Sequence, residues 1–281
     1  DHLDYHDGFE DYFDAKAGLF RRVLPDGATA VINIDDERGA DLAGELSKVL
    51  TVGHDSANIC IKDTRYRANG LDVLVAFDGT SHMVPLDLIG AFQADNVMLA
   101  AGLAIACGAD AAKVFEVLPK LQTVRGRMER VATRGNGAMV FVDFAHTPDA
   151  LETALQAMRP HVMGRLLVVF GAGGDRDKGK RPLMGKAAME NADVVYVTDD
   201  NPRTEDPTQI RAAIMTACPN ANEIGDRAEA ILTAIDALQP GDALLIAGKG
   251  HETGQIVGTD ILEFNDAEQA SIAVAALEEL Y

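Results

Sequence analysis

The sequence predicts an α/β protein of two domains, the second of them Rossmann-like with a mostly parallel sheet. Its 281 residues exceed the usual length of one domain. Segments rich in β-branched residues alternate with longer segments of helical apolar periodicity. From Gly137 onward this alternation is regular, which favours right-handed βαβ units. We place the domain boundary near residue 124, giving expected domains 1–123 and 124–281.

The expected first domain has several strands before any helix. The spacers between its β-rich segments are short, and the longer apolar-periodic segments come last. We expect strands at 29–34, 57–62, 72–77 and 81–86, then helices near 94–107 and 110–121.

The expected second domain alternates strands and helices throughout. We expect strands at 139–144, 166–170, 193–199 and 243–247, with helices near 148–158, 182–190, 207–217 and 266–280. Asp206 before Pro207 predicts an N-cap followed by proline at the first helical position. Asn265, three residues before Glu268, predicts a variant of the capping box.

Composition narrows the class of protein. Three widely separated cysteines, Cys60, Cys107 and Cys218, share no metal-ligand spacing, so we expect packing roles and a reducing compartment. No apolar run approaches the roughly 20 residues of a membrane span, and the N-terminus does not resemble a signal peptide. We therefore expect a soluble, cytoplasmic protein without membrane insertion.

The charge balance is strongly acidic, with 44 acidic against 25 basic residues and a net charge of -19. This balance repels nucleic acid and anionic membranes, so an anionic ligand requires a local basic cluster. Two such clusters exist, one at 125–130 and one at 176–181.

Polar loops follow all four expected strands of the second domain, at 143–148, 171–178, 199–203 and 248–252. Ligands of open parallel sheets bind beyond the carboxyl ends of the strands, where these loops should meet. Their alternating carboxylates and guanidinium groups suit a zwitterionic ligand. Solvated loop charge is the alternative for any single loop, but it is a weaker explanation for all four.

Two nucleotide-binding motifs are incomplete. The glycine loop at 171–174 lacks the third glycine of a dinucleotide fingerprint, because Arg176 stands there. The pair Gly248-Lys249 lacks the first glycine of a Walker A loop, where Ala243 stands, and Gly250 replaces its Ser or Thr. Neither NAD binding nor a phosphate loop is therefore predicted in this region.

Six motifs in order give the chain a family resemblance. They are DHLDYH at 1–6, GRME at 126–129, DFAHTPDAL at 143–151, GGDRDKGKRPLM at 173–184, DNPRTEDP at 200–207 and GKGHE at 248–252. Across essentially its whole length the chain resembles the Mur ligases, and within them the members that add meso-diaminopimelate. The resemblance implies the later part of a central ATPase domain, followed by the Rossmann-like domain that binds the amino acid.

The resemblance also implies the reaction. ATP would phosphorylate the terminal carboxylate of UDP-MurNAc-L-Ala-D-Glu, and the amine of meso-diaminopimelate would attack the acyl phosphate during peptidoglycan synthesis, with Mg²⁺ stabilising the charge. The family's phosphate loop and its magnesium-binding glutamate would lie upstream of Asp1. We therefore expect this chain alone to be inactive. We also expect a monomer.

In the first domain the resemblance assigns metal and nucleotide residues. His2 matches a histidine that helps to hold a second Mg²⁺, and Lys16 a lysine whose carbamate offers oxygen donors to that ion. An ordinary surface lysine is the alternative for Lys16. Asn96 matches an asparagine that faces adenine, while Gln93 stands where many relatives have another asparagine and keeps the amide group.

Near the domain boundary the resemblance assigns two further nucleotide contacts. Arg127 matches an arginine that reaches the ATP phosphates, which makes it a catalytic residue together with Lys16. Asp143 matches a carboxylate that accepts hydrogen bonds from the ribose hydroxyls. Because both lie close to a hinge, we expect domain closure to assemble the site. His251 is not assigned a catalytic role.

The amino-acid pocket implied by the resemblance comprises Arg176, Asn201, Arg203, Gly248 and Glu252. Arg203 would clamp the distal carboxylate of meso-diaminopimelate, so lysine, which lacks it, would leave the guanidinium unpaired. Two alternatives stay open. One is a related Mur-type ligase for another amino acid or a peptide, and the other is a chain that binds without turnover.

Overall fold

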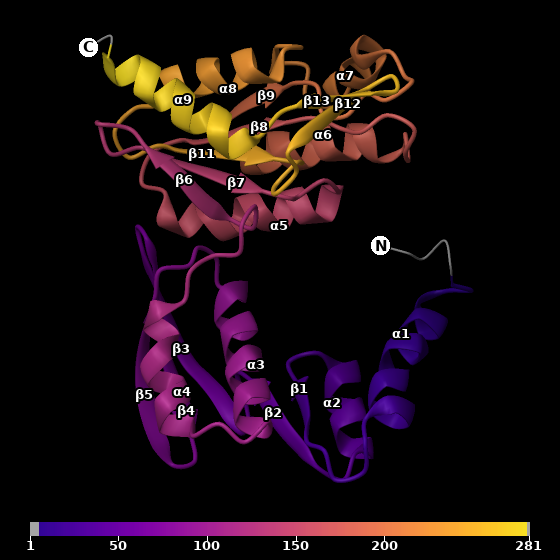
Figure 1. Cartoon of the computed structure of the whole chain (residues 1–281), viewed down its shortest axis with the longest axis vertical. Coiled ribbons are helices and arrows are strands. Elements are labelled where there is room, and N and C mark those ends of the chain that lie inside the picture. Colours follow the sequence, from indigo (N-terminus) through magenta and orange to yellow (C-terminus); the bar gives the residue numbers. More distant parts are fainter. Residues whose placement is uncertain (1–5, 280–281) are drawn as a thin grey trace. The chain divides into compact units, whose positions relative to one another are not determined.

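The computed structural model describes residues 6–279 and forms two compact units, Asp1–Leu121 and Gln122–Tyr281 (Figure 1). Each unit has its own sheet and its own hydrophobic core. Among residues 6–279, no helix has the length and apolar character needed to cross a membrane.

The first unit is built on a five-stranded sheet. Its order follows the chain, β1 Ala30–Asn33, β2 Val49–Gly53, β3 Ile59–Arg67, β4 Gly70–Phe77 and β5 Thr80–Leu86. The pairs β1–β2 and β2–β3 are parallel, whereas β3–β4 and β4–β5 are antiparallel. Only the first three strands therefore share a carboxyl edge of the kind that binds ligands in α/β proteins.

The helices of the first unit are α1 Phe9–Gly18, α2 Glu37–Glu45, α3 Phe92–Ala106 and α4 Ala111–Val117, with a π-helical turn Leu19–Val23 and a 3₁₀ turn Leu118–Lys120. The apolar side of α3 packs on the sheet, and Met98 is fully buried there. The four expected strands and the two late helices are present.

The expectation that no helix precedes α3 is wrong, because α1 and α2 do. Strand β2, between β1 and β3, was not predicted. Helix α1 buries only Ala17 and Gly18, so its sequence carries little apolar periodicity. Helix α2 buries only Leu42. Its position is set instead by Asp36, which accepts hydrogen bonds from two backbone N–H groups of the first turn.

The second unit contains a six-stranded sheet in the order β10-β9-β8-β11-β7-β6. The strands are β6 Glu129–Thr133, β7 Met139–Asp143, β8 Leu166–Phe170, β9 Val194–Val197, β10 Asn222–Glu223 and β11 Ala243–Ala247. Every pairing is parallel except β6–β7. This confirms the mostly parallel sheet. Strands β8 and β11 are buried at every position, which explains their uninterrupted apolar sequences.

Helices cover both faces of this sheet (Figure 1). They are α5 Pro148–Met158, α6 Lys180–Asn191, α7 Pro207–Met215, α8 Arg227–Asp236 and α9 Asp266–Glu279, with a 3₁₀ turn Arg159–His161 and a hairpin of β12 Gly254–Val257 and β13 Asp260–Glu263. Helices α8 and α9 pack together on one face, and α5 and α6 lie on the other. The sequence did not predict α8, β6, β10 or the hairpin, whose second strand is exposed at every position and so lacks an apolar face.

Asp206 and Asn265 both cap their helices, but within residues 6–279 the Glu268 side chain makes no return hydrogen bond to complete a capping box. Asp206 accepts a hydrogen bond from the Thr208 N–H at 2.9 Å. Asn265 accepts from the N–H groups of Ala267 and Glu268 at 2.9 and 3.2 Å.

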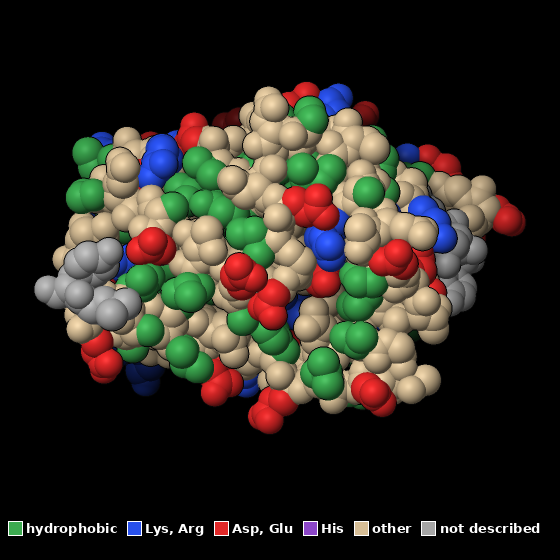
Figure 2. Space-filling model, turned by 90° about the horizontal axis from the view of Figure 1, so that it is seen from above, with side chains coloured by type: hydrophobic (Ala, Val, Ile, Leu, Met, Phe, Trp, Pro, Cys, Tyr) green, Lys and Arg blue, Asp and Glu red, His purple; other side chains and the backbone are tan. Residues whose placement is uncertain are grey.

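The cysteines are unpaired, and Cys60 and Cys218 are buried. The packing role expected for Cys107 is wrong, because that side chain is exposed where α3 ends. Acidic side chains are spread over the face of the molecule seen in Figure 2, with few basic ones between them, as the net charge leads one to expect.

Candidate functional site

The four polar loops of the second unit meet at one edge of the sheet. Strands β7, β8, β9 and β11 run parallel, so their carboxyl ends point the same way. Asp143 at the end of β7 lies opposite Ala247 at the end of β11, and Phe170 lies opposite Val197 at the ends of β8 and β9. The loops that follow these residues are therefore neighbours, as the sequence predicted.

Asn201 and Glu252 are in direct contact although they are 51 residues apart. The Asn201 Nδ2 donates to Glu252 Oε2 at 3.0 Å. The Asn201 Oδ1 accepts from the Ile256 N–H at 2.9 Å and from Lys249 Nζ at 2.9 Å. Asn201 is buried and Glu252 is partly exposed, so the pair reaches from the interior of the unit to its surface.

Arg203 lies against the glycine loop after β8. Its backbone has a positive φ of 51°, and its Nη1 donates to the carbonyl of Gly174 at 2.9 Å. A Cβ added at Gly173 would lie 2.8 Å from Arg203 Nη1 and 3.7 Å from Arg176 Cγ. A side chain at position 173 would therefore require the Arg203 guanidinium to shift. The Arg176 side chain is exposed, and its Nη1 donates to the Asp175 carbonyl at 3.0 Å.

Gly248 lies at a close approach between loops of the edge. Its φ of 118° favours glycine, and an added Cβ would lie 2.6 Å from Asp200 Oδ2. Its N–H donates to the Asp143 carbonyl at 3.1 Å. The loop after β11 therefore passes between the loops after β7 and β9 with no room for a side chain.

The Asp143 carboxylate is oriented by two backbone groups. It accepts from the Met128 N–H at 2.7 Å and from the Ala145 N–H at 2.8 Å. Burial raises the pKa of Asp143, and these two hydrogen bonds oppose that rise. Arg127, from the same turn as Met128, is exposed and stacks its guanidinium 4.7 Å above the Phe144 ring.

An ion-pair cluster that the sequence did not predict joins two of the loops. Arg181, which is buried, donates to Glu205 Oε1 at 2.9 Å and to Oε2 at 3.1 Å. Glu205 also accepts from the Asp175 N–H at 2.6 Å and pairs with Lys178 at 3.0 Å. The hydrogen bond from Arg181, followed by those from Asp175 and Lys178, lowers the pKa of Glu205 to about 2.

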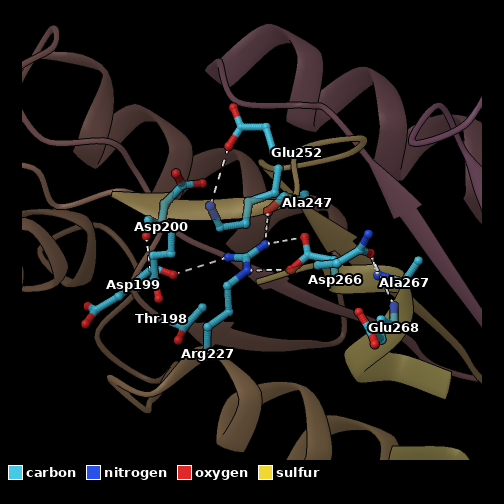
Figure 3. A network of polar contacts seen from close by, with 12 residues as sticks. Thr198, Asp199, Asp200, Arg227, Ala247, Glu252, Asp266, Ala267 and Glu268 are labelled. Carbon is cyan, nitrogen blue, oxygen red and sulfur yellow. Dashed lines mark hydrogen bonds and ion pairs between the residues drawn. The ribbon is translucent and has the colours of Figure 1, made fainter. Parts of the chain in front are cut away.

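A fully buried ion pair lies behind the edge (Figure 3). Arg227 contacts both oxygens of Asp266 at 2.7 and 2.8 Å, and neither side chain is exposed. Arg227 also donates to the carbonyl of Ala247 at 3.0 Å and to that of Asp199 at 3.4 Å. The pair fixes the ends of β9 and β11. Its only signal in the sequence was an acidic residue at the start of α9.

In the first unit the predicted metal residues are not brought together within the described part of the chain. His2 lies outside residues 6–279. Lys16 is exposed on α1, with its Nζ 4.6 Å from the centre of the Tyr12 ring. Among residues 6–279, Lys16 forms no ion pair, so its amine is accessible.

The two predicted adenine-facing amides are neighbours in the first turn of α3. Asn96 Nδ2 donates to Gln93 Oε1 at 3.4 Å. This is a long hydrogen bond between two side chains at the surface. Both amides therefore have donors and acceptors left for a ligand.

Beside them lies a group that the sequence did not predict. Asp35, His54 and Asp95 bring their ligand atoms within 4.8 Å of one another. His54 Nδ1 is 2.7 Å from Asp35 Oδ2, and burial raises the pKa of Asp95. The group offers one nitrogen and two carboxylate oxygens, but it is held together by its own hydrogen bond, so we assign no ion to it.

Comparison with known proteins places the chain in a class. Residues 1–104 match the Mur ligase middle domain, and residues 126–250 match the glutamate ligase domain of Mur ligases. The chain belongs to the Mur ligase family.

Its relatives include two curated UDP-N-acetylmuramoyl-L-alanyl-D-glutamate–2,6-diaminopimelate ligases. That of Bradyrhizobium diazoefficiens is 51% identical over 98% of this chain, and that of Caulobacter vibrioides is 47% identical over 99%. The chain spans 58% of the length of each. A solved structure of an enzyme with the same name is 37% identical, with a TM-score of 0.71 over 99% of this chain and 58% of its own. The UDP-N-acetylmuramate-alanine ligase of Thermotoga maritima, at 18% identity and a TM-score of 0.70, shares the fold.

Proposed function

We propose that this chain is the larger part of a cytoplasmic, ATP-dependent ligase that adds meso-diaminopimelate to UDP-MurNAc-L-Ala-D-Glu in peptidoglycan synthesis. The observation that carries the proposal is the meeting of Asn201, Arg203 and Glu252 at the carboxyl edge of the second sheet. Relatives that bear the name of this activity support the choice of substrate. In this proposal 1–123 serves ATP, and 124–281 binds the amino acid.

The charges of this edge suit an amino acid with two carboxylates. Within residues 6–279, the Arg203 guanidinium donates only through Nη1, to the backbone carbonyls of Gly174 and Asn201. Its remaining N–H groups can donate hydrogen bonds to the distal carboxylate. Arg176 can donate to a carboxylate from the other side of Gly173. Glu252 is placed to accept hydrogen bonds from an ammonium group.

The residues proposed for the nucleotide come from both units. Hydrogen bonds from two backbone N–H groups fix the Asp143 carboxylate. Its remaining lone pairs can accept hydrogen bonds from ribose hydroxyls. The Arg127 guanidinium lies over the Phe144 ring and is exposed, so its N–H groups can donate to phosphate oxygens. The amide of Asn96, with that of Gln93 beside it, would form hydrogen bonds with adenine, both as donor and as acceptor.

At Lys16, the residue proposed for the metal, magnesium fits only through modification of the side chain. The free Lys16 ammonium has no lone pair for a metal, whereas its carbamate would present oxygen atoms, and His2 would add a ligand from outside the described residues. The exposed, unpaired Lys16 amine is open to carbamylation. When bound, Mg²⁺ would neutralise charge on the phosphoryl group being transferred.

Calorimetric titration of this chain with meso-diaminopimelate tests the proposal, with L-lysine as the ligand that lacks one carboxylate. We expect binding of meso-diaminopimelate at least tenfold tighter than binding of lysine, about 1.4 kcal/mol. Arg203→Ala should abolish this preference, because it removes the guanidinium that pairs with the distal carboxylate. Arg65→Ala, an exposed arginine of β3, is the control.

Equal binding of both amino acids would contradict the assignment of Arg203 and favour a Mur-type ligase for another amino acid. Selective binding by this chain, with no turnover in a chain extended to the full length of its relatives, would favour a binding role. Turnover of a peptide in place of meso-diaminopimelate by the extended chain would favour the peptide-adding members of the family.

A further inference from the structure

A lysine ammonium is completely buried beneath the proposed amino-acid pocket. Lys249 has 0% exposure, and its Nζ donates to the Gly254 carbonyl at 2.7 Å, to Asn201 Oδ1 at 2.9 Å and to Glu252 Oε2 at 3.5 Å. An ammonium has three N–H donors, so these contacts use all of them. Burying a charge is unfavourable unless it is paired and hydrogen-bonded, and this site supplies both conditions.

The lysine fixes which way round the Asn201 amide lies. Asn201 Oδ1 accepts from Lys249 Nζ and from the Ile256 N–H, which occupies both of its lone pairs. Reversing the amide would set its NH₂ group against two donors. Nδ2 gives one hydrogen to Glu252 and keeps one for a ligand. Asn201 can therefore offer a ligand a donor, which suits a carboxylate.

The same lysine fixes the acid that faces the ligand's amine. Glu252 Oε2 is occupied by Asn201 and Lys249, whereas Oε1 has no hydrogen bond with any residue from 6 to 279. The Glu252 side chain is 36% exposed while that of Lys249 is 0% exposed. One oxygen thus points into the buried network, and the other is left for an ammonium group.

Lys249 also joins its own loop and the hairpin that follows it to the loop after β9, 48 positions earlier in the chain. It contacts the loop after β9 through Asn201, its own loop through Glu252, and the start of β12 through the Gly254 carbonyl. Strand β12 in turn holds Arg203, whose N–H donates to the Ile256 carbonyl at 3.0 Å. The hairpin, the Asn201–Arg203 turn and Glu252 therefore share one buried anchor.

We propose that Lys249 is a positioning residue for the amino-acid substrate, which orients the Asn201 amide toward a carboxylate and the Glu252 carboxylate toward an ammonium without touching the substrate. This inference rests on the proposed function. It predicts that loss of the lysine weakens amino-acid binding specifically, and leaves ATP and the nucleotide-linked acceptor unaffected.

Steady-state kinetics of the enzyme at the full length of its relatives provide the test. Lys249→Met should raise the KM for meso-diaminopimelate roughly tenfold or more, with kcat and the other two KM values changed less than about twofold. Lys249→Gln keeps hydrogen-bond donors but loses the charge, so it should give an intermediate KM. Arg165→Met is the matched control, because it breaks the Arg165–Asp242 pair where β8 and β11 begin, at the opposite edge of the sheet.

An unchanged KM for meso-diaminopimelate in Lys249→Met would overturn the proposal, as would an equal rise in Arg165→Met, which would indicate general loosening of the unit. If Lys249→Met does not fold, Lys249→Gln decides: a raised KM supports the proposal and an unchanged KM overturns it. Failure of the proposed function is distinguishable, because the unsubstituted enzyme would then show no turnover with meso-diaminopimelate.

Discussion

The two units hold their candidate residues in opposite ways. In the second unit, Asn201 and Glu252 are linked to each other and to Lys249 by buried polar contacts. In the first unit, Lys16 is exposed and Asn96 makes one long hydrogen bond of 3.4 Å. The difference indicates that the residues proposed to bind the amino acid are organised without a ligand, whereas Lys16 and Asn96, proposed to serve the metal and the nucleotide, are held by few contacts.

The sheets account for this difference. Four parallel strands of the second unit end at one edge, so four loops can brace one another there. In the first unit only β1, β2 and β3 run parallel, and β4 and β5 turn back. Lys16 comes from α1, outside that sheet, where its Nζ lies over the ring of Tyr12 from the same helix.

The largest effect expected from this comparison is the loss of the anchor behind the second site. Asp266→Ala leaves Arg227 buried without its carboxylate partner, which should lower the free energy of unfolding by about 3–5 kcal/mol. Urea denaturation of the chain, followed through the transition of the second unit, measures the change. Glu268→Ala, an exposed acid in the same first turn of α9, is the matched control.

If Asp266→Ala cost no more than Glu268→Ala, the buried pair would not be the anchor that distinguishes the second unit. The contrast between the units would then lie in loop packing alone. Binding of meso-diaminopimelate to the variant, measured while it is still folded, would show whether the ends of β9 and β11 need Arg227 to keep the site in place.

The parallel second unit was largely predictable from sequence, because the fully buried β8 and β11 read as uninterrupted apolar runs. Several predictions failed where elements bury little, although α8, which buries an apolar face, was also missed. Helix α1 buries only Ala17 and Gly18, and the exposed β13 shows no apolar alternation. Cys107 was expected in the core, but it lies exposed at the helix end, where periodicity no longer constrains a side chain.

Within the site, the sequence predicted which loops meet but not how they are held. The polar residues after each strand identified the edge, because topology alone brings the carboxyl ends together. The contact between Lys249 and Asn201 links residues 48 positions apart, and the pairs Arg181–Glu205 and Arg227–Asp266 link residues 24 and 39 positions apart. No local pattern encodes such contacts, since they depend on the assembled geometry of several loops.

A smaller effect is expected in the first unit, where the test concerns modification of a side chain. In the enzyme at the full length of its relatives, Lys16→Ala should lower kcat at least tenfold, about 1.4 kcal/mol, because the carbamate oxygens are lost. Added short carboxylates such as acetate should restore part of the rate by supplying oxygen donors. Lys48→Ala, another exposed lysine of this unit, is the control.

An unimpaired Lys16→Ala enzyme would leave Lys16 an ordinary surface lysine. Impairment without rescue by carboxylates would instead assign Lys16 a role as a cation. Either result would sharpen the contrast with the second unit, whose residues need no modification to present their charges.

The smallest effect concerns the ion-pair cluster that braces two loops of the second unit. Arg181, with Asp175 and Lys178, lowers the pKa of Glu205 from 4.5 to about 2. A carboxyl group whose pKa is lower in the folded state stabilises the fold above its unfolded pKa, and loses that contribution as the pH falls through its folded pKa. The Tm of Glu205→Gln should therefore be below that of the unsubstituted chain at pH 7, by less than the Tm change in Asp266→Ala. The Tm difference between Glu205→Gln and the unsubstituted chain should become smaller as the pH falls from 4.5 to 2. Thermal unfolding measured across that pH range tests this, with Glu263→Gln on the exposed β13 as the control for loss of one surface charge. A Tm difference between Glu205→Gln and the unsubstituted chain that stayed constant with pH would contradict the assignment.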